Sequence, residues 1–447
     1  MNVRFKSSPS RQEKETGRRR CLLVLVPILM ASIAAGHPDH AEGQAVQDGQ
    51  GEHQNPIRLS LDDALRMFVE NNFQLLVAKY GIQAAKAQQV TAGLFINPEF
   101  SVGLFSSVTQ GCTPARCGGV MPQVSQLFLI AGKRGYRIES ASLGTAGAEA
   151  EFEDAVRQLS FAVKDTYFRA KVIRDHLEVD QRIKARILNL IQETSADHSS
   201  AISARKRIRL ELLGVQTERE VIKDIRELGE ATLDLRILLG LPPETILDLT
   251  TPLVYRRVEP DIRAIRTSVI DSRPDLRAKR LLQAQRKTEI RLARALQYPD
   301  PMVGVGVMLQ GPQGPDNQQQ WNVGVSVPLP IFDRNQGGIL QAETAFQVAE
   351  VDYRQAEMTA RNELERAYHR FLESRRLVEV YQTGILDRAL TLLTMAQQER
   401  EKGQLGILEL VDAARAAHET KEDYLDALFS YQRAIFRLEN AAGQVIH

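Results

Sequence analysis

The sequence predicts a mainly helical protein with a small amount of β-strand, built from two copies of one structural unit. A pattern that starts at Ser60 recurs from Asp261 with a constant offset of 201 residues. In each copy, runs in which apolar residues alternate with small ones follow a proline, which indicates strands. Segments without proline then follow, and they are long enough for helices well beyond the usual length.

Each unit opens with a short amphipathic stretch and an Ala/Gln-rich helix that ends near a proline, Pro98 in the first unit and Pro299 in the second. Two strand-like runs come next, separated by a polar, glycine-rich loop. Each unit is therefore expected to hold a β-hairpin followed by two long helices. The four runs are residues 100–104, 124–125, 303–308 and 323–327.

The longest helix is expected from about Gly338 to Glu401, a stretch without proline and with almost no glycine. As one continuous helix it would be on the order of 90 Å long. Spacings of three and four along it, and along its counterpart, predict a seam that packs helices side by side in a coiled bundle. The two seams are Leu364, Ala367, Phe371, Ser374, Val378, Tyr381, Ile385, Arg388, Leu392 and Met395, and Phe152, Val156, Leu159, Val163, Thr166, Ala170, Ile173 and Leu177.

Composition and motifs argue against two function classes. A net charge of +1 with 25% charged residues excludes a strongly basic nucleic-acid surface. The sequence has no Walker-type, His-Glu-x-x-His or Ser-His-Asp pattern, and Gly304-Val305-Gly306 lacks the rest of a dinucleotide fingerprint. We therefore expect no enzymatic activity and no cofactor.

The N-terminus predicts export. Three arginines at 18–20 precede an apolar stretch at 22–35 that ends in small residues, as in a secretory signal peptide covering residues 1–36. A twin-arginine signal is the weaker alternative. Residues 37–58 are expected to form a flexible leader, in which His37 and His40 are weak candidates for metal ligands; the metal content is otherwise unknown.

Removal of the signal peptide would leave two cysteines, Cys112 and Cys117, in the loop of the first hairpin. An even number of cysteines in an exported protein favours a disulfide between them. Two free thiols and a soft-metal pair remain alternatives.

If the exported chain enters a membrane, the strands are the expected route, because no other stretch has the length of a transmembrane helix. Four strands cannot close a barrel, so several chains would have to pool their strands. Trp321, at the start of the fourth run, suits a membrane interface. A soluble hairpin packed on helices is the alternative. One face of the strands is predicted to be apolar, with Phe100, Val102, Leu104, Val303, Val305, Val323, Val325 and Val327.

The chain resembles the TolC-like outer-membrane efflux factors from about residue 59 to residue 443. The resemblance rests on the signal peptide, the duplicated unit, the segment 403–412 and the run Val-Pro-Leu-Pro-Ile-Phe-Asp-Arg-Asn-Gln-Gly at 327–337, whose wording is similar to the CzcC-like heavy-metal cation branch. It implies three chains that pool four strands each into a twelve-stranded outer-membrane β-barrel, continued by an α-helical barrel across the periplasm. On this basis repeat 1 is expected at 59–240, an inter-repeat linker at 241–260 and repeat 2 at 261–443.

The resemblance also implies the function and the partners. The chain would be the outer-membrane channel of a tripartite, RND-type system that passively exports substrate, here heavy-metal cations. It would form a homotrimer in the lipid of the outer membrane, extend into the periplasm, and bind a periplasmic adaptor protein and an inner-membrane RND pump. A duct for type I protein secretion or for drug efflux, and an exported coiled-coil scaffold, are the alternatives.

The resemblance places specific residues at the periplasmic end. Gly403 matches the turn between the long helices, so that Gly403 and Leu405 would form the adaptor-docking tip. Glu409 and Asp412 match acidic positions that line the closed aperture, and residues three apart share a helix face. In a trimer they would form rings of carboxylates that attract cations; solvated surface acids are the alternative reading. The first-half turn, expected around 203–205, has no glycine.

Three residues are expected at the junction between barrel and helices. Pro328 and Pro330 would end the strand ladder, because proline cannot donate a backbone hydrogen bond. Asp333 would cap the helix that follows. In the first half the matching positions are Gly132 and Lys133, so only one junction is expected to have this cap.

Overall fold

The structure is a computed structural model that describes residues 56–106, 118–195, 201–310 and 319–446. The chain divides into two units, residues 1–55 and 56–447, and the described residues belong to the second. The expected signal peptide and most of the leader, with His37 and His40, lie outside the described residues, as do Cys112 and Cys117. The disulfide therefore stays a prediction.

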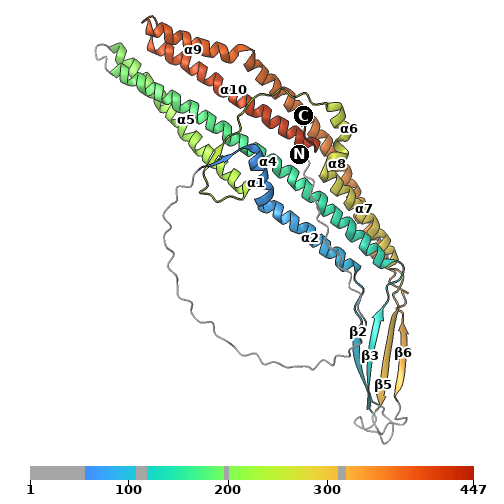
Figure 1. Ribbon diagram of the computed structural model, residues 1–447. Helices are drawn as coiled ribbons and strands as arrows, with labels where there is room; N and C mark the ends of the chain where they lie inside the picture. Colours follow the sequence, from blue (N-terminus) through green and yellow to red (C-terminus); the bar gives the residue numbers. More distant parts are fainter. Residues whose placement is uncertain (1–55, 107–117, 196–200, 311–318, 447) are drawn as a thin grey trace, which may run out of the picture. The chain divides into compact units, whose positions relative to one another are not determined.

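The described chain is mainly helical with a four-stranded sheet, which confirms the expected fold class (Figure 1). Helices α1 and α6 begin and end 201 residues apart, so the duplicated unit is present in the backbone as well as in the sequence. The first half holds β1 (Ile57–Leu59), α1 (Leu61–Asn71), α2 (Phe73–Gly93), β2 (Glu99–Ser106), β3 (Gly118–Leu127), α4 (Lys133–Ser195) and α5 (Ala201–Leu239). The remainder holds β4 (Leu247–Leu249), α6 (Ile262–Ser272), α7 (Pro274–Ala295), β5 (Met302–Gln310), β6 (Gln320–Ser326), α8 (Gln336–Val380), a π-helical turn (Tyr381–Ile385), α9 (Leu386–Glu401) and α10 (Ile407–Ala442).

The sheet has the antiparallel order β2-β3-β5-β6. Directly opposed residues of antiparallel strands project to the same face. One row across all four strands consists of Phe100, Val124, Val305 and Val323, whereas a neighbouring row runs from Ser125 through two glycines. The expected apolar face is therefore confirmed by the strand register.

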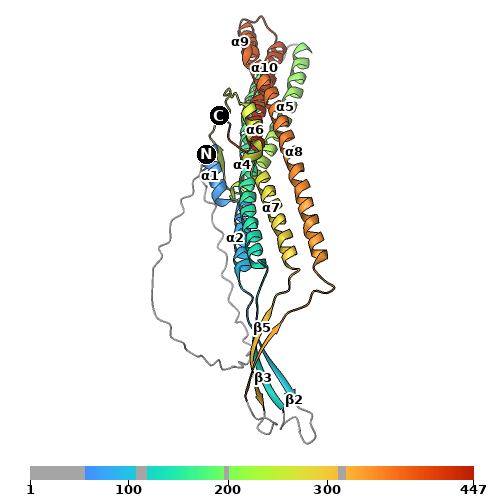
Figure 2. The ribbon, with the colours of Figure 1, turned by 90° about the vertical axis from the view of Figure 1, so that its right-hand side faces the viewer.

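The long helices lie side by side (Figure 2). Helix α4 packs against α2, α5, α7 and α10, and α8 packs against α7 and α10. The seam of α4 is confirmed, since all of its predicted positions are buried or half-buried and all but Thr166 and Leu177 belong to the main core. On α8 the seam is confirmed from Leu364 to Val378. Among the described residues, no helix is both long and apolar enough to cross a membrane.

The expected continuous helix at 338–401 is wrong, because it breaks within the π-helical turn at Tyr381–Ile385. Gly384 has φ +109°, a conformation that side-chain-bearing residues rarely adopt. Thr383 and Gly384 both leave the helical conformation, so α9 does not continue the helix of α8 in register. Beyond it, the predicted Leu392 and Met395 are exposed and their neighbours Leu393 and Ala396 face the core.

The segment that joins the halves is anchored to the bundle. Strand β4 pairs in parallel with β1, so residues 57 and 58 of the expected flexible leader are held in a strand, which corrects that expectation. The Tyr167 hydroxyl donates to the Leu59 carbonyl at 2.7 Å and accepts from the Thr251 N–H at 3.0 Å. One buried tyrosine thus fastens both segments to α4.

Candidate functional site

The turn between α9 and α10 is a glycine-terminated helix end. Gly403 has φ +74°, its N–H donates to the Arg400 carbonyl, and the Gln404 N–H donates to the Glu399 carbonyl, each at 2.9 Å. This pair of bonds defines the Schellman motif. The structure thus places Gly403 in the turn where the sequence put it, and adaptor docking there stays a prediction.

The Leu405 side chain packs between α9 and α10 beside this turn. It is half-buried against Leu393 and Ala396 of α9 and Leu410 and Ala413 of α10. The side chain therefore holds the two helices together at the tip, and its expected part in docking stays a prediction.

The two acids expected at the aperture lie in the first turns of α10 and are exposed. Oδ1 of Asp412 is 3.8 Å from a guanidinium nitrogen of Arg209 on α5, and both side chains are more than 60% exposed. Glu409 lies over the helix start, since a Cβ built at Gly406 would be 2.3 Å from its Oε2. Exposed ion pairs contribute little stability, so the contact with Arg209 holds Asp412 only weakly. Both acids are accessible to solvent.

The expected helix cap at the barrel junction is wrong. Helix α8 begins at Gln336 with Asn335 at its N-cap position, and Asn335 has φ +56°. Oδ1 of Asp333 accepts from the Asn335 N–H at 2.8 Å, so its carboxylate closes a turn before the helix instead of capping it. Pro328 and Pro330 follow the last residue of β6, where the strand ladder has ended.

The first-half turn also differs from its expected place. Helix α5 already begins at Ala201, so residues 203–205 are helical and the connection precedes them. Glu211 is exposed, and a Cβ at Gly214 would touch Ile187 of α4 at 3.7 Å. Gly214 is therefore a close-packing position between α4 and α5.

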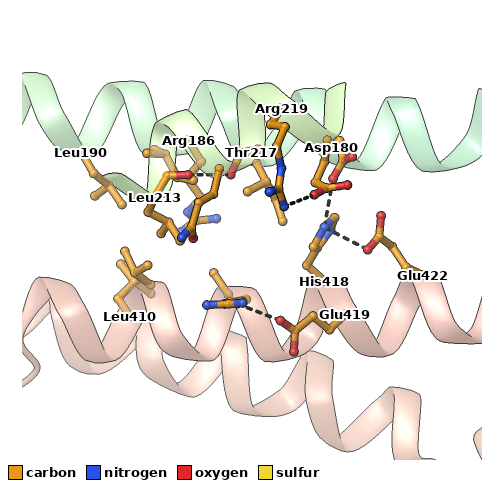
Figure 3. Close-up of a pocket in the computed structure, with 17 residues that line it drawn as sticks. Asp180, Arg186, Leu190, Leu213, Thr217, Arg219, Leu410, His418, Glu419 and Glu422 are labelled. Carbon is orange, nitrogen blue, oxygen red and sulfur yellow. Dashed lines mark hydrogen bonds and ion pairs between the residues drawn. The ribbon is translucent and has the colours of Figure 1, made fainter. Parts of the chain in front are cut away.

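A cavity of about 380 Å³ lies between α4, α5 and α10, near the tip (Figure 3). One end is apolar, and Leu190, Leu210, Ile407 and Val411 form a small core beside it. The other end is charged. The polar lining includes Asp180, Arg186, Arg219, Glu220, Arg415, His418, Glu419 and Glu422.

The charged end is centred on His418. Its Nε2 lies 3.0 Å from Oδ1 of Asp180 and 3.3 Å from Oε2 of Glu422 (Figure 3). Burial lowers the pKa of His418, but its hydrogen bond with Asp180 and the charge of Glu422 outweigh this and raise the pKa above its usual value. Burial, together with the charges of Asp180 and Asp224, raises the pKa of Glu422 to about 7 despite the opposing effect of His418.

Sequence reasoning missed this cluster. His418 and Glu422 are four residues apart, a spacing that puts both on one face of α10 and was visible in the sequence. Asp180 lies on a helix of the other repeat, and only the packing of α10 against α4 brings it to them. Nothing in the local sequence of α4 indicates that contact.

Comparison with known proteins supports the fold and its class. The family described as outer membrane efflux protein matches residues 266–444. The cobalt-zinc-cadmium resistance protein CzcC of Cupriavidus metallidurans is 22% identical over 406 residues, which are 86% of this chain and 90% of that protein. An uncharacterized protein of Haemophilus influenzae is 23% identical over 68% of this chain and 67% of its own length.

Solved structures share the fold across most of the chain. A structure of CusC, described in terms of transmembrane channel formation, has a TM-score of 0.70 at 19% identity and covers 86% of this chain and 92% of that one. The CmeC outer membrane channel of Campylobacter jejuni has a TM-score of 0.73 at 14% identity, with 87% and 86% covered. At these identities the likeness concerns the fold.

Proposed function

Since this chain belongs to the outer membrane efflux protein family and has the TolC-like fold, we propose that it is the outer-membrane channel of a tripartite, RND-type efflux system. Three copies would pool their strands into a twelve-stranded barrel, and their long helices would form a duct into the periplasm. A periplasmic adaptor and an inner-membrane pump would complete the path. The chain itself would supply a passage and no chemistry.

The open sheet is the observation that carries this proposal. Strands β2 and β6 are its two edges, and all seven residues of β6 are exposed in the single chain. Unpaired strand edges invite pairing with other strands. Backbone groups in a bilayer must be hydrogen-bonded, so a membrane would accept this sheet only after neighbouring copies had joined it.

We further propose heavy-metal cations as the cargo. The support is the name of the relative CzcC, a cobalt-zinc-cadmium resistance protein. Glu409 and Asp412 fit this cargo, because rings of exposed carboxylates near a threefold axis would favour cations.

Cell fractionation followed by unheated gel electrophoresis tests the channel. We expect the full chain in the outer-membrane fraction as a trimer that becomes a monomer on heating. A periplasmic monomer would refute the proposal and leave a scaffold with a packed hairpin. Zinc, cobalt and cadmium tolerance of a deletion strain then tests the cargo: tolerance equal to that of the complemented strain would exclude these cations.

Single-channel recording tests the aperture. Replacing Glu409 and Asp412 together with alanine should raise conductance several-fold and weaken block by divalent cations, because it removes the like charges crowded at the constriction. The matched control replaces Glu350 and Glu357 of α8, which removes the same charge far along the chain from the tip. Equal traces for the two double variants would remove the aperture assignment.

A further inference from the structure

We propose that Asp180, His418 and Glu422 form a binding site for one divalent transition-metal cation of the Zn²⁺ class, joining helix α4 to helix α10. This site is separate from the aperture acids and does not depend on what the channel exports. Each side chain offers one ligand atom, and the three atoms lie within 4.8 Å of one another.

The distances suit a metal ion. Ligands about 2.0–2.1 Å from a tetrahedral zinc ion lie roughly 3.3 Å apart. Nε2 of His418 is 3.0 Å from the Asp180 oxygen and 3.3 Å from the Glu422 oxygen, so two of the edges already have this length. His418 and Glu422 keep their relation through one turn of α10. Only a small movement of side chains is needed to enclose an ion.

The site is buried and rich in negative charge. The side chains of Asp180, His418 and Glu422 are 4%, 13% and 28% exposed. Two carboxylates therefore share one imidazole in a place where water screens them poorly, and buried charges without full compensation are costly. A divalent cation would neutralise the pair.

A third carboxylate, that of Asp224, adds to the uncompensated negative charge. Asp224 of α5 is 7% exposed, and within the described part of the chain its Oδ2 has no hydrogen-bond partner although it is buried. The charge of Asp180 acts on Asp224, so this third carboxyl is a neighbour of the proposed ligands. Nδ1 of His418 is likewise buried without a partner in the described residues.

The arginines around the cavity do not supply the missing charge. Arg219 pairs with Glu220 at 2.8 Å, and Arg415 pairs with Glu419 at 2.7 Å. The guanidinium of Arg186 faces the side-chain amide of Gln397, whose oxygen accepts from it once the amide is turned by 180°. Among the residues that the structure describes, none of these guanidinium groups forms an ion pair with Asp180 or Glu422.

The donor set selects the kind of ion. One imidazole nitrogen and two carboxylate oxygens suit Zn²⁺ or Co²⁺, whereas Ca²⁺ and Mg²⁺ prefer oxygen alone and Cu⁺ prefers sulfur. The adjoining cavity of about 380 Å³ has room for a water molecule as fourth ligand. The occupied site would cross-link two helices that come from different repeats.

The test uses the full chain, purified in detergent and stripped with EDTA, and titrated with Zn²⁺ alone in a calorimeter. We expect one ion per chain. His418→Gln should weaken binding at least about tenfold, and Glu422→Gln should do the same if the first variant does not fold. The control is His369→Gln, which alters an exposed imidazole of α8 and should bind like the parent. Co²⁺ should give the intense visible bands of a tetrahedral site in the parent and not in His418→Gln.

Three outcomes would overturn the proposal: no binding at micromolar Zn²⁺, equal binding by His418→Gln and the parent, or a loss that follows replacement of the leader histidines His37 and His40. Because the readout is metal binding by the purified chain, its failure is distinct from failure of the efflux proposal, which is read by localisation and trimer formation.

Discussion

The first two helices of each repeat begin at matching positions, but different side-chain chemistry holds them in place. Asn72 and Arg273 occupy positions 201 residues apart, each between the two short helices of its repeat. The Asn72 side chain accepts from the Leu75 N–H and donates to the Leu238 carbonyl, which makes it a neutral helix cap. Arg273 makes no cap, and its buried guanidinium bonds Asp275, Glu363 and a carbonyl of α10.

Both repeats retain a close contact between the end of the last helix and the end of the first. In both repeats a glycine with positive φ ends the last helix beside this position: a Cβ at Gly240 would lie 2.5 Å from the Asn71 carbonyl oxygen, and one at Gly443 would lie 2.9 Å from that of Ser272. Asn71 and Ser272 are again 201 residues apart. The close approach of helix end to helix end is conserved between the repeats, while the side chain that secures it changed from an amide to an ion network.

The largest expected effect comes from breaking the ionic fastening. Arg273→Met should destabilise the chain by about 3 kcal/mol, the low end for a broken buried ion pair because Glu363 reaches solvent. Asn72→Ala should cost only about 1 kcal/mol. Urea denaturation of the detergent-solubilised chain, followed by circular dichroism, measures both. Equal losses would mean that the two fastenings do the same work despite their different chemistry.

The stability contributed by the Arg273–Asp275 pair of the second repeat should depend on pH, whereas that contributed by Asn72 should not. Burial raises the pKa of Asp275, but the hydrogen bond and the charge of Arg273 outweigh it and hold the pKa below its usual value. The resulting stability is present above about pH 4 and is lost as the pH falls through the lowered pKa. Arg273→Met should weaken this loss of stability at acid pH without abolishing it, because Arg157 also lowers the pKa of Asp275, while Asn72→Ala should leave it unchanged.

Smaller stability changes are expected from glycine substitutions in the long helices, with opposite signs in the two repeats. Gly384→Ala places a side chain at φ +109° and should cost about 1–2 kcal/mol. Gly229→Ala in the interior of α5, where nothing lies within 4 Å of the new Cβ, should gain up to about 1 kcal/mol. Thermal melting of the two variants checks the signs. Stabilisation by both would show that the break at Gly384 is not needed for packing.

The sequence predicted those features that depend on local pattern. The strand alternation and the seam as far as Val378 follow from short-range rules, whereas the turn at Gly403 was expected from the family resemblance, and the structure agrees with all three. The sequence could not predict the role of Asp333. Helix α8 begins after the turn at Asn335, and the Asp333 carboxylate bonds to that turn instead of capping the helix. Nor could the sequence predict Asp180 beside His418, which depends on how two distant helices pack.

The π-helical turn at Tyr381–Ile385 also makes the direction of the tip separable from the packing of the bundle. The backbone angles of Thr383 and Gly384 therefore set the direction of α9, with the Gly403 turn at its end, separately from the seam of α8. A change of backbone conformation at this one joint could turn the Gly403 end of the molecule in a new direction without repacking the seam between Leu364 and Val378.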